Sequence, residues 1–416
     1  MLAYGERNQA IKGRKPMNHI TPINDHDRPE TANTRAFLSA GFRPFFLFAG
    51  ISGVVPIAAW LLAFLGDGST PGEFAPAQWH GHEMIFGFVT AAAAGFLLTA
   101  VPNWTRSAPF SGWPLAVLVS IWLGGRLAMW FGAPIGALPV AIIDLTMIPV
   151  LAFYIGRRIV AHKMRRNYIV LAVLFALFVA NLLMHLEALQ VFENSAWFGL
   201  NLGIYVVILL VTLISGRVIP GFTANALRRQ GIEIDTQTPN YMTVMVIASL
   251  ILAAVFDLFT IEGAGFLAAL AAAALLLRMW RWKTLMVLND PLVWVLHAGH
   301  LWLVIGFALL ALAGFSDGLE RDAGLHALTA GAMGTMVLGM MTRVALGHSG
   351  RDMKVRAPIV VAYLMVIIGA LLRVIAVIAP MGSSFAYLIG AAGLLWAGGY
   401  VIFTIVYWPI LTRPRL

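Results

Sequence analysis

The chain has no cysteine among its 416 residues, and only 11% of the residues are charged. Without cysteine there are no disulfides and no thiolate ligands, so a transition metal must be held by imidazole, methionine or carboxylate groups. A soluble domain carries about 25% charged residues, whereas 60% of this chain is hydrophobic. The composition therefore predicts an all-α, polytopic integral membrane protein, a helical bundle in contact with membrane lipid.

Missing motifs exclude several other classes of protein. The chain has no glycine-rich nucleotide-binding loop and no Rossmann fingerprint. His82-Glu83 is followed by Met84-Ile85-Phe86, so the zincin motif is also absent. Adjacent paired histidines, typical of the catalytic subunit of a haem-copper oxidase, do not occur. The net charge of +9 does not indicate nucleic acid, because the basic residues gather in short loops.

Apolar runs long enough to cross a bilayer recur along most of the chain. A transmembrane helix needs about 20 apolar residues, and this rule predicts about twelve spans in one domain, residues 41–416. The polar residues 1–40 lack an apolar segment before about residue 37, which predicts a disordered cytoplasmic tail and not a cleaved signal peptide. The expected spans are 44–66, 83–101, 113–132, 134–156, 167–189, 197–216, 240–258, 262–280, 291–314, 323–344, 357–380 and 384–411.

The charges of the loops alternate from one side of the predicted bundle to the other. One side receives nearly all of the arginine and lysine residues, whereas Arg321 is the only basic residue in the opposite loops. The positive-inside rule then predicts that both termini are cytoplasmic. An even number of spans agrees with this orientation.

Seven of the ten histidines lie in or at the edges of the predicted spans. Lipid penalises polar side chains, so a histidine in a membrane needs a partner, and a metal is a good one. The topology predicts that four of the seven converge in the outer leaflet near Glu83 and Glu187. These four are His80, His82, His185 and His326, and the other three are His297, His300 and His348.

Spacing along a helix restricts which of these histidines can bind one ligand together. His80 and His82 are about 200° apart, so they cannot both face one ligand unless the helix begins between them. His297 and His300 share a face, which suits joint chelation or one ligand with a hydrogen-bonding neighbour. His348 lies at the cytoplasmic end of the tenth span.

One face of the tenth span is predicted to carry an imidazole, thioethers and a cation in line. Methionine is a soft ligand for Cu(I) and a plausible neighbour of haem, although it also fills core space. Met333 and Met336 are therefore candidate metal ligands. The residues of this face are His326, Thr329, Met333, Met336, Met340 and Arg343.

Two arginines lie inside predicted spans, toward the outer side. Haem takes axial imidazoles and its propionates need cations, so Arg126 and Arg373 are candidates for cofactor binding. Each could instead snorkel or pair with a carboxylate such as that of Asp144. Together, the histidines and arginines indicate a redox metal or haem site inside the bundle.

Several long motifs in this chain occur in the same order in the NnrS family, which the chain resembles over nearly the whole membrane portion. These motifs are Arg43–Phe48, Trp79–Phe88, Gly95–Thr105, Gly216–Thr223, Trp294–His297 and the segment from His326 to Arg351. Members of that family are bacterial cytoplasmic-membrane proteins that contain haem and copper and are associated with the nitric-oxide response and nitrosative stress.

The resemblance implies the same location, cofactors and role for this chain, with nitric oxide or a derived species as its small-molecule partner. The family often has tyrosine at the position of His300, so this residue is a weaker candidate ligand. The stronger candidates are His80, His82, His185, His297 and His326. The sequence does not divide them between haem and copper, and it does not identify an electron donor.

Other functions remain open at the level of sequence. Nitric oxide could be turned over, bound or sensed, so enzymatic activity is not assigned. A secondary transporter for a metal ion or small solute would also use many spans and intramembrane histidines, and it would show helices broken at the midplane. Pro56 and Pro149 interrupt spans, but no duplicated half is evident. A structural partner in a respiratory complex would leave the histidines unexplained.

Overall fold

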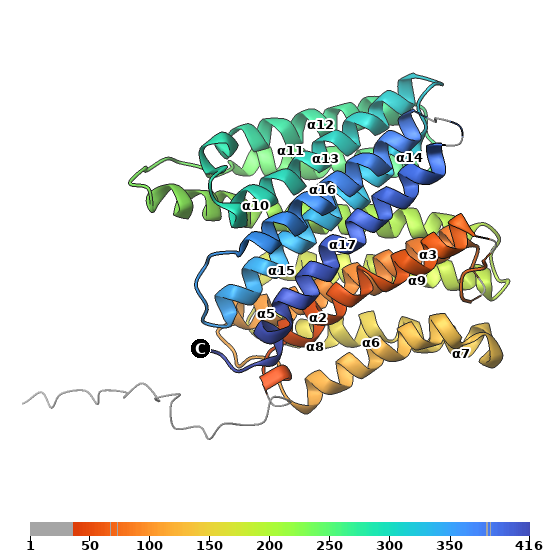
Figure 1. Cartoon of the computed structure of the whole chain (residues 1–416), viewed down its shortest axis with the longest axis horizontal. Coiled ribbons are helices and arrows are strands. Elements are labelled where there is room, and N and C mark those ends of the chain that lie inside the picture. The colour runs from red at the N-terminus through yellow and green to blue at the C-terminus, as the bar shows by residue number, and fades with distance from the viewer. Residues whose placement is uncertain (1–35, 67, 73, 380–381, 383) are drawn as a thin grey trace, which may run out of the picture.

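The computed structural model describes residues 36–66, 68–72, 74–379, 382 and 384–416. Most of the predicted N-terminal tail, residues 1–35, lies outside the described residues. Every regular element in the described part of the chain is a helix (Figure 1). Eleven of these helices are long and apolar enough to cross a membrane, and a twelfth, α12, is apolar and slightly shorter. The predicted polytopic helical bundle is therefore confirmed.

The twelve spans follow one another with short connections. The first six are α2–α3 (Phe42–Ser52, Val55–Leu65), α4–η2–α5 (Pro76–His82, Glu83–Val89, Thr90–Thr105), α6 (Trp113–Phe131), α7–α8 (Ala137–Leu145, Met147–Ala161), α9 (Tyr168–Ala188) and α10 (Ser195–Arg228). The last six are α11 (Asn240–Leu258), α12 (Ala264–Trp280), α13 (Pro291–Phe315), α14–η6–α15 (Arg321–His326, Ala327–Met333, Gly334–His348), α16 (Ala357–Ile378) and α17 (Ser384–Thr412). A 3-10 turn, η5 (Thr284–Val287), precedes α13.

Two prolines divide predicted spans into shorter helices, and two spans differ clearly from their predicted bounds. Pro56 lies in the first turn of α3 and Pro149 in that of α8, where a missing backbone N–H costs little. The second span begins at Pro76 instead of residue 83, so His80 and His82 lie inside the helix and not at its start. α10 continues past its predicted end at residue 216 to Arg228, so the helix extends beyond the apolar run.

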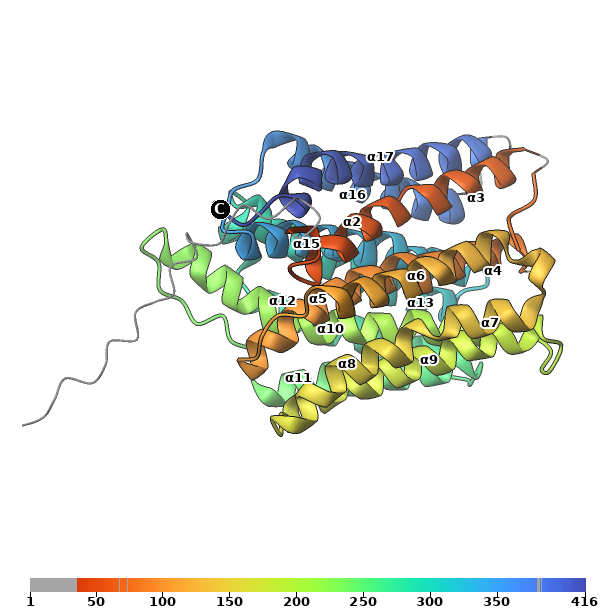
Figure 2. The same ribbon diagram turned by 90° about the horizontal axis from the view of Figure 1, so that it is seen from below.

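The two ends of the membrane domain lie together at one end of the bundle. Arg43, at the start of α2, donates hydrogen bonds to the carbonyl oxygens of Leu411 (3.1 Å) and Arg413 (2.5 Å). α17 packs along α16 and also against α2 and α3. Figure 2 shows α17 and α3 on one side of the bundle and α8 and α9 on the other, with the second span between them.

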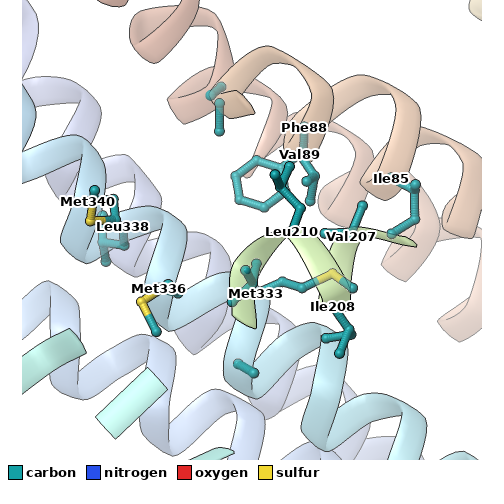
Figure 3. Packing of buried hydrophobic residues seen from close by; sticks show 14 of the residues in the cluster. Ile85, Phe88, Val89, Val207, Ile208, Leu210, Met333, Met336, Leu338 and Met340 are labelled. Carbon is teal, nitrogen blue, oxygen red and sulfur yellow. The ribbon is translucent and has the colours of Figure 1, made fainter. Parts of the chain in front are cut away.

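The second, sixth and tenth spans meet in the centre of the bundle. Two of them contain a seven-residue π-helix, η2 directly after His82 and η6 directly after His326, and both π-helices contact α10. Figure 3 shows this junction: Met333 of η6 lies close to Ile208 and Val207 of α10, with Ile85, Phe88 and Val89 of η2 opposite. π-helical turns are rare and occur often at functional sites. The two π-helices therefore indicate that the histidines directly before them are functional.

Candidate functional site: two histidine sites on either side of one helix

His80 and His82 point to opposite sides of the second span, as their spacing predicts. His82 is fully buried against α7 and α9, where it contacts Asp144 and Asn181. His80 instead lines a cavity, where its ring packs against that of Trp60, tilted by 35° with the ring centroids 4.8 Å apart. The predicted convergence of four histidines therefore resolves into two neighbouring sites. His185 belongs to the site of His82, and His326 to that of His80.

The first site, the closed cluster, consists of His82, Asp144 and His185, contributed by three different spans. His82 Nε2 lies 3.2 Å from Asp144 Oδ2, and His185 Nε2 lies 3.0 Å from the same oxygen. Asn181 Nδ2 donates to this oxygen over 2.8 Å. The three side chains are buried, and one potential ligand atom from each lies within 4.8 Å of the others. Two imidazoles and a carboxylate form a donor set suited to copper or zinc.

Two further charged residues surround the closed cluster. Arg126 of α6 forms ion pairs with Glu83, over 2.5 Å, and with Asp144. With both histidines neutral, two carboxylates face one guanidinium, so the buried cluster carries one surplus negative charge. A buried unpaired charge is costly, and either a proton or one Cu(I) ion would neutralise it. The cluster therefore fits a small monovalent cation.

The orientation of His82 also suits a metal. Its Nδ1 atom is buried, forms no hydrogen bond within the described residues, and lies 3.4 Å from Glu83 Oε1. A carboxylate beside one ring nitrogen commonly orients a histidine whose other nitrogen binds a metal. Here the other nitrogen, Nε2, donates to Asn181 Oδ1 over 2.9 Å, so a metal would replace that proton. Glu83 is itself held by Trp130, whose Nε1 donates to Oε2 over 3.0 Å. Glu83 and Arg126 therefore position the candidate ligands.

The second site, the histidine cavity, has a volume of about 290 Å³. Its walls are mainly apolar and aromatic, and its polar groups include His80, His326, Arg373 and Arg321. Small-molecule sites usually measure about 300–1,000 Å³, so the cavity is large enough for more than an ion. Other lining residues include Trp60, Met84, Phe88, Thr329, Met333 and Trp396.

Three polar groups in this cavity suit a haem group. His326 Nδ1 donates to the backbone oxygen of Asp322 over 2.8 Å, so the lone pair of this imidazole lies on Nε2. Buried His80 Nδ1 and Arg373 Nη1 have no hydrogen-bond partner among the described residues. Imidazoles supply axial ligands to haem, and its propionates need cations. His80, His326 and Arg373 therefore fit the group that the family resemblance implies.

The remaining candidates lie outside these two sites or have other partners. Both ring nitrogens of His297 are 2.9 Å from a threonine hydroxyl, Thr223 on one side and Thr284 on the other. Within the described residues, His297 and His300 join no three-ligand cluster. The geometry does not favour their joint chelation of a metal. His348 lies at the end of α15, where its ring centroid is 6.1 Å from that of Phe42.

Met333, Met336 and Arg126 are also separated by the structure. Met333 lines the histidine cavity, but Met336 packs against α13, close to Gly299. The predicted line of side chains assumes regular α-helical turns throughout, and the wider turns of η6 shift the register between His326 and Met333. Arg126 pairs with Asp144, the alternative that the sequence left open, and does not line the cavity.

Asp144 is the one residue of the closed cluster that was not a predicted ligand. A carboxylate in the middle of an apolar span is costly in lipid and marks a functional site by default, so the position of Asp144 in the sequence already indicated a functional role.

Comparison with known proteins agrees with the motifs. No curated protein matched the sequence, but the family model named NnrS protein matches residues 36–415, nearly the whole chain. The chain therefore belongs to the NnrS family.

Proposed function

We propose that this protein is a haem- and copper-containing protein of the bacterial inner membrane that acts in the nitric-oxide response and protects against nitrosative stress. Membership of the NnrS family supports the nitric-oxide response in general. The observation that carries the more specific proposal is the pair of unlike sites on the two sides of the second span. One is a closed N/N/O cluster, and the other is a cavity with two histidines and an unpaired arginine.

In this proposal each site holds the group that matches its size and charge. His82, His185 and Asp144 would hold copper, with Glu83 and Arg126 fixing their orientation. His80 and His326 would hold haem, and Arg373 would neutralise a propionate. When bound, a reduced haem or copper centre supplies the capacity to bind a small diatomic ligand. The side chains keep the two centres apart on one rigid helix.

The walls of the histidine cavity suit a small apolar ligand. Nitric oxide is uncharged and partitions into lipid, so it can reach a site between helices directly from the bilayer. The apolar surface of the cavity includes Ile57, Phe88, Ile389 and Trp396.

The loop charges support the proposal that both termini are cytoplasmic. The contact of Arg43 with the last residues of the membrane domain keeps both ends of that domain on one side.

The proposal is tested by visible spectra of the purified full-length protein, oxidised and dithionite-reduced, with metal analysis of the same sample. We expect a sharp Soret band, iron and copper, and a spectral shift when nitric oxide is added to the reduced protein. A colourless and metal-free protein, purified without chelators from haem-replete cells, would contradict the proposal. That outcome would favour the alternative, a transporter in which the histidines relay protons or pack between helices.

A further inference from the structure

A third polar cluster lies toward the other end of α10, away from both histidine sites, and is centred on Arg278. This arginine, in the last turn of α12, is only 1% exposed. Arg43, the other arginine among the described residues that is buried to this degree, has clear partners, because it donates to backbone carbonyls. Within the described residues, no carboxylate lies within 4.0 Å of the Arg278 guanidinium, although buried charges are normally paired.

One edge of the Arg278 guanidinium is free. The Nε and Nη2 atoms are buried and have no hydrogen-bond partner in the described part of the chain. Their two N–H bonds are parallel, and this edge binds two oxygens of a planar anion side-on. The opposite corner is packed closely, since a Cβ atom at Gly216 of α10 would lie 2.8 Å from Nη1. The guanidinium is therefore packed at one corner, and its bidentate edge has no hydrogen-bond partner among the described residues.

A second donor and an aromatic wall lie in the same layer of the bundle. Thr212 Oγ1 is buried and unpartnered among the described residues, one helical turn before Gly216 and on the same face of α10. His300 adds no donor, because its Nε2 donates to the backbone oxygen of Leu275 over 3.4 Å, which leaves the lone pair on Nδ1, 3.5 Å from Ser215 Oγ. The fully buried ring of Trp282 forms one wall, 4.5 Å from the His300 ring and 5.3 Å from Arg278 Cζ, measured to ring centroids.

We propose that Arg278, with Thr212, binds a small planar oxyanion of the class that includes nitrite, nitrate and formate. A single fixed cation matches one negative charge. A planar anion with two oxygens matches the parallel N–H bonds, whereas a spherical chloride ion cannot use both equally well. The site requires neither haem nor copper, so it does not depend on the function proposed above. Nitrite and nitrate are the members of the class that oxidation of nitric oxide yields.

The test is anion binding by the purified full-length protein in detergent, measured by isothermal titration and by thermal stability. The probes are sodium nitrite, nitrate and formate, with chloride and sulfate for comparison. We expect saturable binding of the planar anions that is at least tenfold tighter than that of chloride or sulfate. Arg278→Lys should weaken this binding at least tenfold, because lysine keeps the charge but cannot present two parallel donors.

A matched control is available at the same end of α12. Arg281 is only half-buried and donates to the backbone oxygen of Gln237, so Arg281→Lys should bind the anions like the wild type. Thr212→Val changes shape little and should weaken binding several-fold, which keeps the proposal testable if Arg278→Lys fails to fold. Absence of saturable binding by the wild type would overturn the proposal, as would equal binding by wild type and Arg278→Lys. The proposal would also be overturned if the wild type bound no anion and Arg278→Lys lost haem absorbance. That result would indicate that the unpartnered edge of Arg278 binds a carboxylate of a cofactor.

Discussion

The two sides of the second span place a histidine in two different environments. On the His82 side, the charged groups are paired: Asp144 contacts both imidazoles and, with Glu83, neutralises Arg126, although His82 Nδ1 and Arg126 Nε have no hydrogen-bond partner among the described residues. On the His80 side, a cavity of about 290 Å³ leaves the nitrogen atoms His80 Nδ1 and Arg373 Nη1 without partners among the described residues. The first arrangement suits a small cation in a preformed cage, and the second suits a larger group that brings its own acceptors.

His80 and His82 belong to different sites because they are two residues apart on one helix and therefore point to opposite sides of it. Gly81, between them, packs so closely that an added Cβ would lie 2.6 Å from Leu200 of α10. The π-helix η2 follows immediately and widens the next turns. The helix is thereby a shared wall, and changes on one side should leave the other side intact.

The largest effect is expected for Asp144→Ala, in the closed cluster. This change leaves Arg126, His82 and His185 buried without their shared partner, and breaking a buried ion pair costs about 3–5 kcal/mol. Chemical unfolding should show this loss, and metal analysis should show loss of copper with the haem spectrum retained. An equally large loss of haem would show that the two sites are not independent.

Next in size is Arg373→Met, in the histidine cavity. Removing a residue that supports a cofactor typically lowers affinity about 10–100-fold, so haem titration of the apoprotein should show weaker binding. Because Arg373 Nη1 has no partner to lose, the stability of the apoprotein should not fall. Marked destabilisation of the apoprotein would contradict the contrast with Asp144.

A smaller effect on both sites together is expected for Gly81→Ala. Its methyl group would collide with Leu200, and overpacking costs about 1–3 kcal/mol. Thermal unfolding should detect the loss, and both copper and haem content should decrease because the shared wall moves. Gly221→Ala is the matched control, since an added Cβ at Gly221 meets no atom within 4 Å. Equal behaviour of the two variants would refute the role of Gly81.

The smallest effect is expected for Thr223→Val, next to His297. It removes one hydrogen bond to a buried imidazole, which is worth about 0.5–1.5 kcal/mol. Copper and haem content should be unchanged, because His297 belongs to neither site. A loss of metal in this variant would restore His297 as a ligand, the role that the sequence predicted for it.

Much of the bundle follows from local properties of the chain. Apolar runs identify the spans because lipid requires every backbone group to be paired within the helix, and the 100° step of a helix separates His80 from His82. The family resemblance, carried by several ordered motifs, is confirmed by the family model over residues 36–415.

What the sequence could not show depends on which helices become neighbours. Asp144 meets His82 and His185 only because α4, α7 and α9 pack together. Met333 and Met336 lie three residues apart but meet different neighbours, the histidine cavity and α13, and the sequence does not show which helices those are. In the same way, the threonines on both sides of His297 come from α10 and η5, far apart in the sequence.

The most direct test compares His80→Ala with His82→Ala by metal analysis and visible spectra of the purified proteins. We expect a reciprocal result: His80→Ala loses haem absorbance and keeps copper, whereas His82→Ala loses copper and keeps haem. If both variants lost the same group, or if both kept wild-type spectra and metal content, the assignment of two sites to the two sides of one helix would be wrong.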